Sequence, residues 1–281
     1  MKRLIVSADD FGLTASVNEG IVKACREGIV TSVNLMPTGE AFAGAVKLAK
    51  EAGIQEAGAH LALTETSPLT GRDKIPTLTT RDGGFYKNYR SFFLRFFTGR
   101  IDLDQVYVEL KSQMDALEKT GITITNLSSH EHIHLVPDIL DIFIKLAKEY
   151  DVPAIRYPHK DSSPRSSLKN IYKSMILFFL GGHVGKALSA SSIVSPEHFR
   201  GLFNSGKLDE ETLIKIARQI EDGTTELVCH PGLMGPEITQ KYTFHAACET
   251  ELAGLTSPRV KKALDECGVK LIRYSDFLSH P

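Results

Sequence analysis

Short apolar runs alternate with longer amphipathic stretches along most of the chain. The run at residues 4–6 predicts a buried strand, and the apolar spacing at 17–25 predicts a helix that Gly28 ends. The same alternation gives further strand patterns at 30–36, 58–63, 122–127, 154–157, 226–229 and 270–272. Helical patterns lie between them, at 41–52, 103–119, 139–150, 168–188, 210–220, 245–255 and 258–267. Because no tight hairpin turn joins two strands, we expect a parallel sheet in an α/β fold, either open and doubly wound or closed into a barrel.

Residues 64–100 interrupt this alternation. Pro68, Pro76 and the Asp82-Gly-Gly84 turn break the pattern, and so long a stretch in a compact domain is usually functional. We therefore expect a long insertion after strand three that overhangs a site. Two apolar concentrations, at 92–97 and 175–180, also fall outside the alternation. Each either packs in a local satellite core or leaves an exposed patch that receives an apolar ligand or rests on a bilayer surface.

Composition narrows the class of protein. With 281 residues, 42% of them hydrophobic and 24% charged, the chain suits one large core, so we expect a single domain over residues 1–281. A formal net charge of −1 without a basic run argues against nucleic acid as a partner. The four cysteines lack C-x-x-C spacing and no signal-peptide pattern precedes the first strand, which predicts reduced thiols in the cytoplasm. The longest apolar runs are far shorter than the roughly 20 residues that cross a bilayer.

Two adjacent carboxylates, Asp9 and Asp10, follow the first strand. Neighbouring side chains on an extended backbone point to opposite sides, so the two acids take different roles unless the chain turns there, which Gly12 permits. One division of roles is a metal ligand and a general base. The alternative is that both residues only begin a turn and cap the helix that follows.

Histidines lie at or near three further strand ends. Each of them alone could be a satisfied structural histidine, but carboxyl ends of parallel strands share one edge of the sheet, where these side chains can meet Asp9 and Asp10. Three of these histidines alternate along the chain directly after the fourth predicted strand. If that strand continues through them, their side chains share one face, and at most two of them can hold one ion. The histidines are His60, His130, His132, His134 and His230.

One aspartate with two histidines is a ligand set for a borderline divalent cation, and it leaves positions open for water and substrate. Such a site lowers the pKa of bound water, and a nearby carboxylate can take the proton, which predicts metal-assisted hydrolysis. His230, at a separate strand end and followed by Pro231, suits a general acid that protonates a leaving amine.

Four motifs together resemble the signatures of the YdjC-like carbohydrate deacetylases, in the family's order. They are Ala8-Asp-Asp-Phe-Gly12, Gly58-Ala-His-Leu61, His130-x-His-x-His134 and Cys229-His-Pro231. The resemblance implies an irregular (β/α) barrel, TIM-barrel-like, whose enzyme removes an N-acetyl group from an amino sugar with a divalent metal ion, usually assigned as Mg²⁺, with Zn²⁺ as the alternative. It further implies that Asp9 is the base, that Asp10, His60 and His130 hold the metal, and that His230 is the acid.

Within that family the chain looks most like the branch associated with hopanoid biosynthesis, HpnK, which implies a glycosylated hopanoid lipid as substrate and peripheral contact with a membrane. The resemblance lies in the opening residues, the Phe-rich segment before 103 and Ala154-Ile-Arg-Tyr-Pro158. The rival substrate is a chitooligosaccharide or another soluble acetylated sugar. Ser128 stands where the chitooligosaccharide branch usually has Asp, a difference that we expect to alter the surroundings of His130.

Two readings outside the hydrolases remain open at this point. Two histidines and one carboxylate also form the facial triad of non-haem iron oxygenases, although that triad usually sits on antiparallel β scaffolds. A catalytically silent carbohydrate-binding relative is the other, but it would need neither Asp9 nor His230 as acid or base. The sequence neither requires nor excludes a homodimer.

Overall fold

Strand β1 (Lys2–Phe11) lies at the centre of one parallel sheet in the computed structural model, which describes residues 1–158 and 183–279. The sheet runs in the order β5-β4-β3-β2-β1-β7-β6, and β8 pairs with the first residues of β1 on the edge opposite β7. The other strands are β2 (Ser32–Leu35), β3 (Glu56–Leu61), β4 (Thr123–Ser129), β5 (Ala154–Ile155), β6 (His198–Arg200), β7 (Gly223–Cys229) and β8 (Val269–Leu271).

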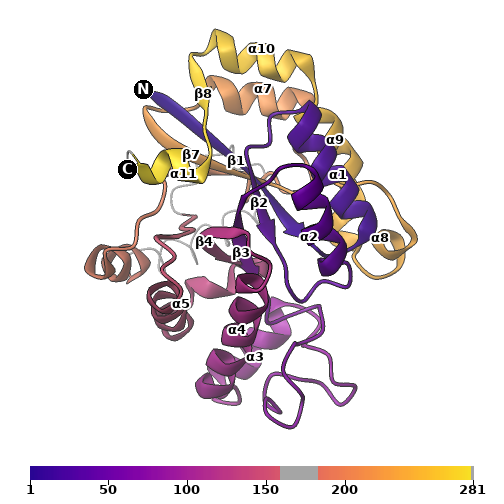
Figure 1. Cartoon of the computed structure of the whole chain (residues 1–281), viewed down its shortest axis with the longest axis vertical. Helices are drawn as coiled ribbons and strands as arrows, with labels where there is room; N and C mark the ends of the chain where they lie inside the picture. The colour runs from indigo at the N-terminus through magenta and orange to yellow at the C-terminus, as the bar shows by residue number, and fades with distance from the viewer. Residues whose placement is uncertain (159–182, 280–281) are drawn as a thin grey trace.

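Helices surround the strands on the outside, as Figure 1 shows. They are α1 (Ala15–Glu27), α2 (Phe42–Glu51), α3 (Tyr89–Phe97), α4 (Leu103–Glu118), α5 (Pro137–Glu149), α7 (Glu210–Arg218), α8 (Pro236–Gln240), α9 (Cys248–Leu255), α10 (Pro258–Glu266) and α11 (Tyr274–Ser279), with 3-10 turns η1 (His130–Leu135) and η2 (Thr243–Ala247). Residues 183–191 are also helical. Among the described helices, none is long and apolar enough to cross a membrane.

The sheet curls into a half-barrel rather than lying flat. Among the described residues no ladder joins β5 to β6, so the curl stays open on that side. Both faces of the strands are covered, and their apolar side chains pack with those of the helices in one large buried cluster that runs from Leu4 to Val269. The prediction of an irregular, TIM-like (β/α) barrel is confirmed, and the flat doubly wound alternative is not what the chain forms.

The last residues of β1 and the turn that follows decide where the two adjacent aspartates lie. Asp10 has φ 65 and Gly12 has φ 127, both in the left-handed region that favours Asp, Asn or Gly. A Cβ atom at Gly12 would lie 2.6 Å from the carbonyl oxygen of Met36, so no larger residue fits. Thr14 caps α1 through its side chain, so the alternative that the aspartates cap this helix is wrong.

Several elements differ from the sequence prediction. The insertion at 64–100 carries a helix, α3, where only a loop was expected. Strand β6 and helix α11 were not predicted, because three and six residues are too short to show a period. The apolar run at 175–180 lies outside the described residues.

Candidate active site

A cavity of about 360 Å³ opens at the carboxyl ends of the strands. All five residues singled out from the sequence as catalytic or metal-binding line it, although the chain separates the first from the last by more than two hundred positions. They are Asp9, Asp10, His60, His130 and His230.

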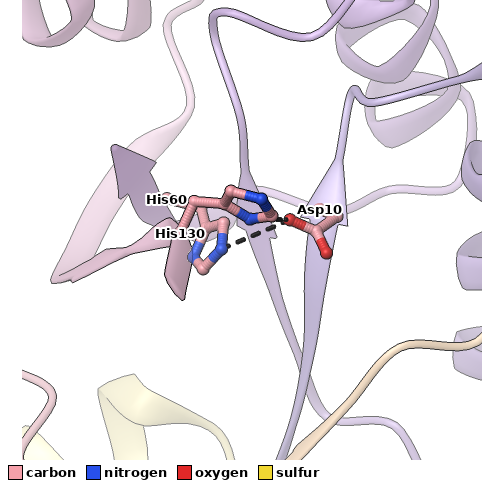
Figure 2. A group of neighbouring side chains, drawn as sticks. All are labelled: Asp10, His60 and His130. Atoms are coloured by element: carbon pink, nitrogen blue, oxygen red, sulfur yellow. Dashed lines mark hydrogen bonds and ion pairs between the residues drawn. The ribbon is translucent and has the colours of Figure 1, made fainter. Parts of the chain in front are cut away.

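Asp10, His60 and His130 form a compact buried cluster. Oδ1 of Asp10 lies 3.3 Å from Nε2 of His60 and 3.0 Å from Nδ1 of His130, and both imidazoles point toward that carboxylate in Figure 2. The three ligand atoms lie within 4.8 Å of one another. One carboxylate and two imidazoles suit a borderline divalent cation and leave positions open, so the residues fit the metal that the sequence implies.

The neighbours of the two histidines fix which nitrogen faces Asp10. The hydroxyl of Ser128 donates to the carbonyl oxygen of Ala59, so it accepts a hydrogen from Nδ1 of His60 at 2.8 Å, and Nε2 is the nitrogen that faces Asp10. Nε2 of His130 lies 2.8 Å from Glu65, a carboxylate that orients the ring in the way common for metal-bound histidines. Each histidine therefore directs one ring nitrogen at the Asp10 carboxylate, an arrangement that suits a cation held among the three side chains.

The pKa values of Asp10 and His130 are shifted by the charges within the cluster. Burial alone raises the pKa of Asp10, but His130, His245 and His60 hold that pKa well below its usual range. Burial lowers the pKa of His130, but the carboxylates of Asp10 and Glu65 outweigh it and raise that pKa well above the usual value. In this buried cluster the positive charge on His130 therefore stabilises the ionised carboxylate of Asp10. A bound cation would stabilise the same carboxylate in place of that charge.

Asp9 lines the same cavity as Asp10 but has different hydrogen-bond partners. Arg156 donates to both of its oxygens, at 2.6 and 2.9 Å, and Asn34 donates to Oδ1 at 2.7 Å. The same guanidinium binds Glu226 at 2.9 Å. Burial raises the pKa of Asp9, but Arg156 outweighs it and holds that pKa well below its usual range, so Asp9 stays ionised.

His230 lines the same cavity, directly after β7. Its backbone N–H donates to Glu251 at 2.7 Å, and its Nδ1 atom lies 3.3 Å from the hydroxyl of Ser205. Burial lowers the pKa of His230 from the usual histidine value, although Glu251 and Asp10 act in the opposite direction. These contacts hold the ring through Nδ1 and leave Nε2 for a ligand.

The His130-x-His-x-His134 cluster is not an extended strand. Strand β4 ends at Ser129, and Glu131 and His132 both have φ 55, so the strand does not persist and the three rings do not alternate as they would on an extended strand. His132 lines the cavity, whereas His134 is fully buried between Ser129 and the carbonyl oxygen of Arg156. Ser128 contacts His60 and not His130, which corrects the expected location of its effect.

Comparison with known proteins identifies the family. The model of the family described as YdjC-like protein matches residues 3–266, which is nearly the whole chain and includes every residue of the cluster. The chain belongs to the YdjC-like family.

Similar YdjC-like proteins bear a common name. A protein of Brevibacillus brevis named "Carbohydrate deacetylase" is 32% identical over 275 residues, which cover 98% of this chain and 99% of that protein. A protein of Thermoanaerobacter pseudethanolicus with the same name is 28% identical, with 98% and 99% covered. A solved structure from Enterococcus faecalis, described as a cellobiose-phosphate cleavage protein, has a TM-score of 0.79 at 25% identity, with 98% of each chain covered.

Four side chains of this YdjC-like site were not singled out from the sequence: Glu65, Arg156, His245 and Glu251. Arg156 stands in a segment recognised as a strand, but its partners Asp9 and Glu226 come from distant strands. His245 and Glu251 stand in a predicted helical stretch without a motif of their own. Only Arg156 could have been noticed in the sequence, because it stands in an apolar strand pattern and a buried arginine requires carboxylate partners.

Proposed function

We propose that this chain is a metal-dependent carbohydrate deacetylase that hydrolyses the N-acetyl group of an amino sugar, acting as one domain over residues 1–281. The observation that carries the proposal is the buried cluster of Asp10, His60 and His130, with Asp9 and His230 on the same cavity. The names of the YdjC-like relatives support the acetylated sugar as substrate.

Asp10, His60 and His130 would hold the cation, with Mg²⁺ as our first choice and Zn²⁺ as the alternative. A divalent cation bound there supplies Lewis acidity, which polarises an amide carbonyl and lowers the pKa of water. Ser128 and Glu65 keep His60 and His130 in the tautomers that present Nε2 and Nδ1 to it. Burial of the cluster keeps bulk water away from the reacting amide.

Asp9 and His230 divide the proton transfers. Asp9, ionised and held by Arg156, accepts the proton of the attacking water. His230, held through Nδ1 and through the backbone contact to Glu251, donates a proton from Nε2 to the nitrogen that leaves as a free amine. The two groups come from β1 and from the end of β7, so a substrate amide bound in the cavity can lie between them.

We further propose that the sugar is linked to an apolar group, as in the glycosylated hopanoid lipid of the HpnK branch. Much of the cavity wall is apolar or aromatic, which a soluble oligosaccharide alone does not require. These side chains are Tyr89, Phe93, Leu135, Val136, Leu202 and Phe244.

Helix α3 would also meet the membrane that carries such a lipid. Tyr89 and Phe93 face the cavity, whereas Leu94 and Phe97 are 69% and 72% exposed. Arg90, one turn before Leu94, is exposed as well, so this face of α3 combines apolar side chains with positive charge. Phe92 of the same run is fully buried, so the segment both packs in the core and leaves an exposed patch.

The test is acetate release from a panel of free and lipid-linked N-acetylhexosamines, including short N-acetylglucosamine oligomers. We expect release from acetamido sugars, with a higher kcat/KM for lipid-linked ones. Faster turnover of soluble oligomers would favour the chitooligosaccharide alternative. Sugar binding without acetate release would indicate a silent binder, and oxygen-dependent turnover with bound iron would indicate an oxygenase.

A further inference from the structure

His245 is a buried histidine beside the cluster for which the proposed chemistry has no role. It lies on η2, is 3% exposed and does not line the cavity. Its Nε2 atom lies 3.1 Å from Oδ2 of Asp10, yet neither ring nitrogen forms a hydrogen bond with the part of the chain that the structure describes. Burying two ring nitrogens without hydrogen bonds costs free energy. We therefore expect His245 to form a hydrogen bond when the site is occupied.

The two carboxylate oxygens of Asp10 face different histidines. Oδ1 lies nearest to His60 and His130, whereas Oδ2 lies nearest to His245. The backbone of Asp10 is fixed at φ 65, so rotation of the side chain decides which oxygen is presented to the two ligand histidines. A group that holds Oδ2 therefore also aims Oδ1.

We propose that His245 is a positioning residue that donates its Nε2 hydrogen to Oδ2 of Asp10 and so aims Oδ1 at the cation held with His60 and His130. The inference rests on the proposed metal site. The 3.1 Å separation is already a hydrogen-bond distance, and a small rotation of the ring or the carboxylate aligns the N–H.

His245 itself stays outside the ligand group. Among the described residues, only Asp10, His60 and His130 offer three ligand atoms within 4.8 Å of one another. His245 packs edge-to-face against His230, at 5.9 Å between ring centroids, and its Nε2 atom lies near Oδ2 of Asp10 rather than Oδ1. Its action on the cation therefore passes through Asp10.

The experiment compares His245→Met with His245→Gln in the full chain. Both replacements are unbranched and similar in length, but only glutamine offers an N–H near the position of Nε2. The affinity of the chelator-treated protein for Mg²⁺ and Mn²⁺ is measured by titration calorimetry, and the melting temperature is measured without metal. We expect His245→Gln to bind within about threefold of wild type and His245→Met to bind about 10- to 100-fold more weakly, the usual effect of losing an orienting partner.

Two outcomes overturn the inference while the proposed function stands. Wild-type affinity in His245→Met would mean that His245 only fills space, and equal losses in both variants would mean that the imidazole is itself a ligand. If His245→Met does not fold, His245→Leu takes its place in the same comparison. A wild-type chain that binds neither Mg²⁺ nor Mn²⁺ would overturn the proposed metal site, and this inference would fall with it.

Discussion

Asp9 and Asp10 are neighbours in sequence with unlike surroundings. Asp9 accepts hydrogen bonds from Arg156 and Asn34, whereas Asp10 faces three histidines. Asp10 has a left-handed backbone with φ 65, so the chain turns at the second carboxylate. Both carboxylates line the cavity, but with different hydrogen-bond partners. Their different partners suit different roles, Asp9 as the base and Asp10 as the metal ligand.

Replacing each aspartate by asparagine tests which of them binds the metal and which acts as the base. We expect Asp10→Asn to lose the cation, and Asp9→Asn to keep it while turnover falls about 10²-fold or more, the usual scale for a general base. Metal content by elemental analysis and acetate release check both. If Asp9→Asn loses the metal and Asp10→Asn keeps it, the assigned roles are reversed.

His230 gives the reaction a pH dependence with a definite sign. As an acid it must be protonated, so turnover falls as pH rises through its pKa, and burial lowers that pKa below the usual histidine value of 6.5. We expect the alkaline fall of kcat to begin on the acid side of 6.5 and to vanish in His230→Gln. An unchanged alkaline fall in that variant would place the acid elsewhere.

At the scale of the elements, most of the site residues could be predicted because they stand at the carboxyl ends of strands. The residues at the ends of β1 and β3 and directly after β4 and β7 were expected at one edge of the sheet, and all of them line the cavity. The turns were not predictable, because η1 and η2 have no period that a sequence pattern reveals. The role of Arg156 was missed for another reason: its two carboxylate partners belong to strands that only the folded sheet makes its neighbours.

Arg156 links β5 to β1 and β7, so its loss should weaken the sheet itself. Arg156→Met leaves Asp9 and Glu226 buried without a cation, which we expect to cost about 3–5 kcal/mol of the free energy of unfolding. The loss is measured by urea denaturation at several pH values.

The pH dependence of that loss follows from the carboxylates. In the wild type the lowered pKa of Asp9 stabilises the fold above about pH 3.8, and this contribution disappears as pH falls through the folded-state pKa. In Arg156→Met the unpaired carboxylates can be protonated instead. The difference between variant and wild type should therefore be largest near pH 7 and shrink toward pH 4, and a constant difference would contradict the pairing.

Helix α3 is the element that would connect the site to a lipid surface. We expect Leu94→Ser and Phe97→Ser each to weaken binding to anionic vesicles by about tenfold and to raise KM for a lipid-linked substrate, since each removes a large apolar contact. Turnover of a short soluble acetamido sugar should stay unchanged. Val108→Ser, which removes exposed apolar surface from α4, is the control. Equal losses on both substrates would show that α3 serves the fold alone.

At the scale of the whole molecule, the pattern of strands and helices predicted an α/β fold but not whether its sheet curls into a barrel. Only the family resemblance implied the barrel. Alternating strand and helix patterns without hairpins require a parallel sheet, whereas curling depends on twist summed over all strands and on short strands such as β5 and β6. The same topology places residues from β1, β3, β4 and β7 at one cavity. Chain-wide similarity to YdjC-like proteins agrees with a site that needs nearly the whole chain.

The most direct test of the account is acetate release by the chelator-treated chain as a divalent cation is returned to it. We expect release to be lost on chelation and to recover in proportion to one bound ion per chain, with no ion and no recovery in His60→Ala or His130→Ala, both of which should still fold because the cluster lies at strand ends. Full activity without metal, or wild-type metal content in either variant, would contradict the central claim.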